Sequence, residues 1–155
     1  MADFHEAVDL KTTIFTPTLA EAEATLLAQS ELHVSAQAWD AAEVLVSQRL
    51  HRDALGRAAS SLFHIVRALL LRAGYQTRSA SEVLDVLCVR FAGAGELPPE
   101  LAAVLARALR YGELCETGLG WVVTPERVVA ELEVYEEHRS GLLAVLAQRG
   151  VKLAT

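Results

Sequence analysis

Five polar side chains lie three or four residues apart in the largely apolar stretch from Gly56 to Gly74. They are Arg57, Ser60, Ser61, His64 and Arg67. At 100° per residue this spacing places them on one face of a helix, with alanine, valine and leucine around the rest. Two guanidinium groups and an imidazole on one face could hold a phosphate or move a proton. The stripe therefore lines a cleft or a dimer seam, or it is only the solvated strip of a buried helix, and its serines could simply let helices pack closely.

A second group of reactive side chains lies within residues 99–115. Arg107 and Arg110 are one helical turn apart, so they either present two guanidinium groups to one anion or only solvate a helix surface. Glu113, one turn further on, could neutralise Arg110. Cys115 has no histidine within several residues, and we expect it to pack at a helix end rather than to react.

The composition narrows the classes of function. The chain has 155 residues, 52% of them hydrophobic, and a formal net charge of −6. This length fits one domain with its own core, and the negative charge means that nucleic-acid binding needs a local positive site. An acidic domain is equally suited to a basic partner protein. The five histidines and two cysteines lack metal-ligand or disulfide spacing, so we expect no metal, no cofactor and a buried Cys88.

Helical periodicity divides the chain into an irregular leader, residues 1–17, and one helical domain, residues 18–150. The first expected helix is either continuous or broken near Ser30. The other four expected helices cover residues 51–73, 79–91, 99–115 and 124–148. Their ends are marked by residues that favour helix termini: these are Thr18 with Glu21, Gly74, Ser79 with Glu82, Pro98 and Pro99, and Thr124 with Pro125.

No β-alternation extends over a useful length, so we expect an all-α antiparallel bundle of about five helices. Arginines interrupt the apolar runs well before the length of a membrane span, and the acidic N-terminus lacks the layout of a signal peptide. The sequence therefore predicts a cytoplasmic protein without a membrane segment.

From about Leu32 to Leu146 the sequence resembles the HEPN domain family, in particular small prokaryotic HEPN proteins often paired with a minimal nucleotidyltransferase. The segment GRAASSLFHIVRALLLRAGYQTRS is similar to the second helix of that family and the turn after it. AGAGELPPEL resembles its Gly-x-Leu-Pro loop, and TPERVVAELE resembles its last helix. Arg110 stands where the fourth helix of the family carries its arginine. The resemblance implies an HEPN-like bundle.

The resemblance also implies a function. HEPN ribonucleases are metal-independent endoribonucleases with a composite site at the interface of a two-fold dimer, where arginines hold the phosphate and a histidine is the acid or base. Here that would assign catalysis to Arg110 and His64, and RNA or nucleotide binding to Arg57, Arg67, Arg107 and Arg110. It implies a homodimer and a nucleotidyltransferase-type antitoxin partner, as in a toxin–antitoxin pair.

The departures from the family pattern leave two functions open. The tandem tyrosines are replaced by Ala59 and Ser60, and Leu114 and Cys115 occupy the positions of an Asp-Tyr pair. No histidine stands four to six residues after Arg110, where ribonuclease members of the family carry one, which would erode a ribonuclease motif. The chain is thus expected to be the HEPN member of such a pair and to bind RNA or nucleotide, or to be a non-enzymatic protein–protein interaction module that keeps the fold.

Overall fold

The computed structural model describes residues 17–91, 95 and 97–152 of the chain. Five α-helices and one π-helical turn account for most of this part, and it contains no β-strand. The prediction of an all-α helical bundle is therefore confirmed. The elements are α2 (Glu21–Ser47), α3 (His51–Arg72), α4 (Ala80–Val86), the π-helical turn (Leu87–Phe91), α5 (Leu101–Thr117) and α6 (Pro125–Gln148).

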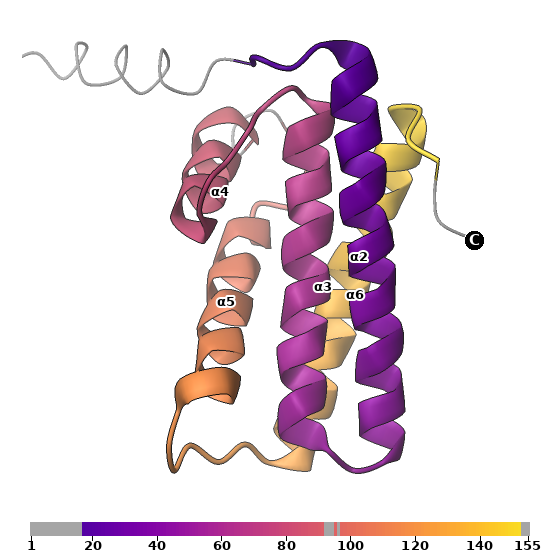
Figure 1. Cartoon of the computed structure of the whole chain (residues 1–155). Coiled ribbons are helices and arrows are strands. Elements are labelled where there is room, and N and C mark those ends of the chain that lie inside the picture. The colour runs from indigo at the N-terminus through magenta and orange to yellow at the C-terminus, as the bar shows by residue number, and fades with distance from the viewer. Residues whose placement is uncertain (1–16, 92–94, 96, 153–155) are drawn as a thin grey trace, which may run out of the picture.

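The central element is α3, which packs against three other helices. Figure 1 shows α2 beside it, α5 on its opposite side and α6 behind it. Twelve of the 22 residues of α3 are buried. Several alanines of α2 and α3 are fully buried, among them Ala28, Ala42, Ala54 and Ala58. Because alanine has only a methyl group, the two helix axes can approach closely.

The beginning of α2 differs from the expectation. We expected Thr18 and Glu21 to form a capping box, but α2 begins at Glu21, after Ala20, and no side chain caps it. The backbone N–H groups of Thr18 and Leu19 instead donate to the carbonyl oxygen of Gly74, at 2.9 and 3.2 Å. These two hydrogen bonds hold the segment before α2 against the turn that ends α3. The helix then runs unbroken to Ser47, so the alternative of a break near Ser30 is wrong.

Other helix ends agree with the sequence signals. Ser79 Oγ accepts a hydrogen bond from the backbone N–H of Glu82 at 3.1 Å, and Thr124 Oγ1 accepts one from that of Arg127 at 3.2 Å. Gly74 has a φ of 93°, which a glycine adopts without the strain of a side chain. The fourth helix is shifted relative to the prediction, since α5 begins at Leu101 rather than Pro99 and ends at Thr117.

The expectation that Cys88 fills the core is wrong, because its side chain is exposed. The last five residues of the third predicted helix form a π-helical turn, Leu87–Phe91. Leu87 and Phe91 point into the core from this turn, and Cys88 lies between them on the outer side.

Arg52, on α3, ties the end of α5 to the core helix. Its guanidinium group donates hydrogen bonds to the carbonyl oxygens of Leu114, Cys115 and Gly118 at 2.9, 3.1 and 3.0 Å. The last carbonyl groups of a helix have no partner within the helix and carry partial negative charge, so a cation stabilises them. Arg52 thereby holds α3 and α5 together at this end of the bundle.

α3 is long and apolar enough to cross a membrane, judged by length and composition alone. An 18-residue window of this helix contains at most two charged residues. However, 67% of that window is buried inside the bundle, as in the core helix of many soluble proteins. Length and composition therefore do not distinguish a membrane span from a core helix here.

Candidate functional site

His64 and Arg67 of the predicted stripe both contact one carboxylate, that of Glu31 on α2. His64 Nδ1 lies 2.6 Å from Glu31 Oε2, and Arg67 Nη1 lies 3.3 Å from Glu31 Oε1. All three side chains are partly buried, so this pairing places one negative charge between the Arg67 guanidinium group and the His64 imidazole. Glu31 was missed at the sequence level, because nothing near it in the chain shows which residue of α3 it faces.

The Glu31 contact also orients the imidazole. An ionised carboxylate only accepts hydrogen bonds, so Nδ1 of His64 carries a proton and the neutral ring has its free lone pair on Nε2. The structure gives Nε2 no hydrogen bond with a described residue. Many histidine general bases in enzymes are held in one tautomer and orientation by a carboxylate in the same way. The geometry of His64 is thus compatible with proton transfer.

Ser61 does not face a cleft. Its Oγ donates to the backbone carbonyl oxygen of Ser35 on α2 at 2.8 Å, and Ser35 Oγ donates to the carbonyl oxygen of Ser61 at the same distance. Both serines are buried. Each hydroxyl group donates to the backbone of the other helix across a close contact, which agrees with the interpretation of Ser61 as a small residue that lets two helices pack closely.

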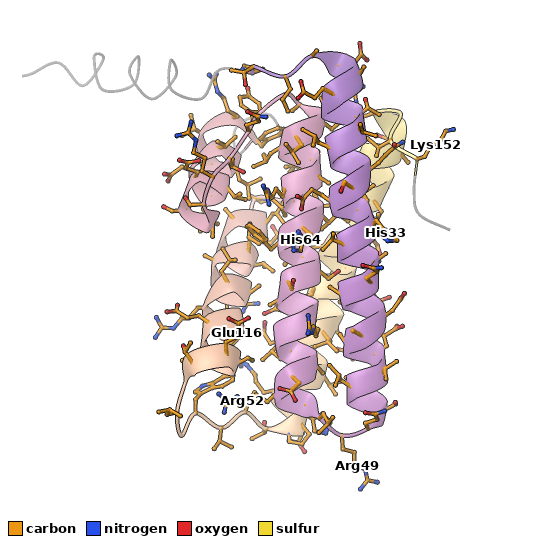
Figure 2. All side chains as sticks on the ribbon, viewed as in Figure 1. His33, Arg49, Arg52, His64, Glu116 and Lys152 are labelled. Carbon is orange, nitrogen blue, oxygen red and sulfur yellow. The ribbon has the colours of Figure 1, made fainter. Side chains whose placement is uncertain are left out.

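Ser60 and Arg57 instead line an open groove between α3 and α5. A hollow of about 380 Å³ is lined by Leu45, Asp53, Gly56, Arg57, Ser60, Cys115 and Glu116. A second hollow, of about 280 Å³, shares three of these residues and is also lined by Ala59, Phe63, Ala108, Leu109, Gly112 and Glu113. We call the two together the α3–α5 groove; Figure 2 shows Glu116 on α5 and His64 on α3.

The floor of the α3–α5 groove is made of small residues. A Cβ atom on Gly56 would lie 3.3 Å from Cβ of Cys115, so a side chain there would press on α5. Partial burial raises the pKa of the Cys115 thiol, which makes it a weaker nucleophile at neutral pH. Cys115 is thus a residue at the end of α5 that packs against α3, as expected.

The charges along the groove are mainly negative. Asp53, Glu113 and Glu116 have no ion pair with any residue that the structure describes, and Arg57 is the guanidinium group among the lining residues. The groove therefore has three carboxylates for one lining cation. A phosphate placed in it would meet net repulsion, while a basic group would be attracted.

Arg107 points away from this groove, towards α6. Its Nε donates to Glu131 Oε2 at 3.0 Å, and the Glu131 side chain is only 6% exposed. Arg127 contacts the other oxygen of Glu131 at 3.5 Å. Burial and the neighbouring Glu131 charge raise the pKa of Tyr135 in the core below this pair. Arg107 thus joins α5 to α6, a role that needs the unpredicted Glu131.

Arg110 is exposed, and the structure gives it no ion pair or hydrogen bond with a described residue. Ala108 and Gly112 border the groove, and a residue two positions from each lies about 200° around the helix. Arg110 therefore lies on the side of α5 that faces away from α3. Within one chain, the structure brings His64 and Arg67 together, whereas Arg107 pairs with Glu131 of α6 and Arg110 is exposed on the side of α5 away from α3.

Comparison with known proteins adds no family assignment: the chain matches no family model, no curated protein and no solved structure at the level required of a match. Among the described residues, no group of three or more histidine, cysteine, aspartate or glutamate side chains is placed to hold a metal ion.

Proposed function

We propose that this chain is an HEPN-like, non-enzymatic interaction module that receives a basic segment of a partner protein in the α3–α5 groove. The observation that supports it is the charge of the groove, where the carboxylates of Asp53, Glu113 and Glu116 face a single lining guanidinium group. Opposite charges across an interface speed association and exclude partners of the wrong sign.

The shape of the groove supports the same occupant. Gly56 and Gly112 let α3 and α5 pack closely where they line the groove, and the small side chain of Ser60 leaves the groove open beside them. Grooves between helices commonly accept an amphipathic helix. The occupant is thus a helix with small or apolar side chains on its buried face and lysine or arginine at its edges. The nucleotidyltransferase-type partner implied by the sequence resemblance is the first protein to test for such a helix.

RNA or nucleotide binding is the second candidate, and one observation favours it. Arg57 and Arg110 are exposed, and neither has an ion pair with a residue that the structure describes. Both guanidinium groups are therefore available to a phosphate. Because Arg110 faces away from α3, a site that combines it with His64 needs a second copy of the chain. Metal-independent cleavage of RNA would therefore require a two-fold homodimer, and this candidate includes both.

A binding assay separates the two candidates. The probes are a labelled synthetic helical peptide with lysines along both edges and a labelled single-stranded RNA oligonucleotide, each followed by fluorescence anisotropy. We expect the peptide to bind, and Glu113→Gln with Glu116→Gln to weaken it about tenfold, as for loss of charged contacts. Glu126→Gln with Glu133→Gln makes the same change in net charge on the exposed side of α6 and should have little effect.

The opposite pattern would support the second candidate. Tight RNA binding that is lost in Arg57→Ala and in Arg110→Ala, with no effect of the groove carboxylates, would replace the protein-interaction proposal. Cleavage of the oligonucleotide in the presence of a chelator, abolished in His64→Ala, would also show that the chain is an enzyme. Sedimentation velocity on the same samples shows whether the chain forms a homodimer.

A further inference from the structure

A third hollow lies on another side of the molecule, between α6 and the segment that leads into α5. Its volume is about 310 Å³, at the lower end of the range for small-molecule sites. The apolar part of its lining is Leu97, Pro98, Leu101, Leu142 and Val145. Gly141 adds open space on α6, because a Cβ atom placed there would meet no atom within 4 Å. None of these residues lines the α3–α5 groove.

One buried polar atom in this hollow, Nε2 of His138, lacks a hydrogen-bond partner. The side chain of His138 is only 7% exposed, and its Nδ1 lies 2.9 Å from the carbonyl oxygen of Val134. A carbonyl oxygen can only accept, so Nδ1 carries the proton and the neutral ring has its lone pair on Nε2. Nε2 is buried and has no hydrogen bond. Glu100 Oε1, at 3.9 Å, is too far away to form one.

The charged residues around the hollow define the ligand further. Glu100 and Glu137 line it, and no lysine or arginine does. A carboxylate or phosphate ligand would be repelled by these two groups. A cation would be attracted, and an ammonium group also supplies the N–H donor that Nε2 of His138 lacks.

We propose that this hollow binds a small organic amine. The apolar body of the amine fills the space beside Leu101 and Leu142, and its ammonium group donates to His138 Nε2. The carboxylates of Glu100 and Glu137 balance the positive charge. This site uses none of the groove residues, so it holds or fails independently of the function proposed above.

Benzylamine is a suitable probe, with benzyl alcohol and benzoate as analogues that differ in charge. Titrations followed by ¹H–¹⁵N and histidine ring NMR should show saturable binding of benzylamine, weaker binding of the alcohol and none of benzoate. Gly141→Leu should abolish binding because it fills the hollow, and leucine is well tolerated in a helix. His138→Phe should weaken binding about tenfold or more through loss of the acceptor, whereas His33→Phe, at an exposed position on α2, should not.

Three results would overturn the proposal. Absence of saturable benzylamine binding would exclude an amine site. Equal binding of benzoate would show that the carboxylates do not select for charge. Unchanged affinity in Gly141→Leu would show that the ligand binds elsewhere, and this variant keeps the test valid if His138→Phe does not fold.

Discussion

α3 presents polar side chains to two neighbours, and the two sides differ in how these groups are satisfied. Towards α2, Ser61 bonds with Ser35, and His64 and Arg67 pair with Glu31. Towards α5, Arg57 and Ser60 line an open groove without such partners. Buried polar groups in stable proteins are almost always paired, so the side towards α2 is built for stability. On the side towards α5, Arg52 is paired with carbonyl oxygens at the end of α5, but Arg57 and Ser60 can gain contacts from a binding partner.

The adjacent serines provide the sharpest test of this difference. Ser61→Leu should lower the free energy of unfolding by about 3 kcal/mol, because it overpacks the contact with α2 and removes a buried hydrogen bond. Ser60→Leu should change it by less than about 0.5 kcal/mol, since its side chain extends into the groove. Urea denaturation of both variants measures the difference. Equal destabilisation would mean that the groove is as tightly packed as the α2 contact.

The two arginines at the same end of α3 should also differ. Arg52→Ala is expected to cost about 2 kcal/mol, because three carbonyl oxygens at the end of α5 lose a charged donor. Arg57→Ala should be nearly neutral for stability while changing what the groove binds. Thermal denaturation compares the two variants, and a larger effect of Arg57→Ala would contradict the comparison.

A carboxylate on each side gives a smaller effect. Glu31→Gln should destabilise the fold by about 1 kcal/mol, since it weakens a partly buried contact with His64 and Arg67. Glu116→Gln, in the groove, should be neutral or slightly stabilising because it removes one of several neighbouring negative charges. Urea denaturation at low and high salt measures the change in the free energy of unfolding for both variants. Salt should reduce the Glu116→Gln difference more, as exposed charges are screened more effectively.

The smallest expected difference concerns the two thiols. Partial burial raises the pKa of Cys115, so less of its reactive thiolate is present near neutral pH, and its reaction should accelerate only at higher pH. Cys88 is exposed. Iodoacetamide should therefore label Cys88 several-fold faster, as peptide mass spectrometry would show. Faster labelling of Cys115 would indicate that the groove opens more widely than its packing against Gly56 suggests.

Local signals in the sequence were sufficient for much of the fold. Ser79, Thr124 and Gly74 mark helix ends because their conformations and hydrogen bonds depend on residues within one turn. Thr18 failed as a cap because a long-range partner, the carbonyl oxygen of Gly74, orders that segment instead. Cys88 was misplaced because the apolar run that contains it does not show which of its residues face the core; Leu87 and Phe91 do, and Cys88 lies on the outer side.

The candidate site was predicted less completely, for a related reason. The sequence identified the cations of α3 and α5, but not the carboxylates that neutralise them. Glu31 and Glu131 lie 33 and 24 residues from His64 and Arg107. Which carboxylate meets which cation depends on the rotation of each helix about its own axis, and no local pattern shows that rotation. The role of Arg52 was missed for the same reason, because the carbonyl oxygens that accept its hydrogen bonds are more than 60 residues away in the sequence.

The central position of α3 has a consequence for biosynthesis. Its apolar surface is covered by α2, which precedes it in the sequence, and by α5 and α6, which follow it. The last of these, α6, is complete only at Gln148, which is 76 residues after Arg72. At about 5–20 residues per second, the ribosome needs several seconds to add that length. During that time α2 can shield one side of α3, while the side that α6 will cover remains exposed. A nascent chain that ends before α6 is therefore a natural client for chaperones and prone to aggregate when they are scarce.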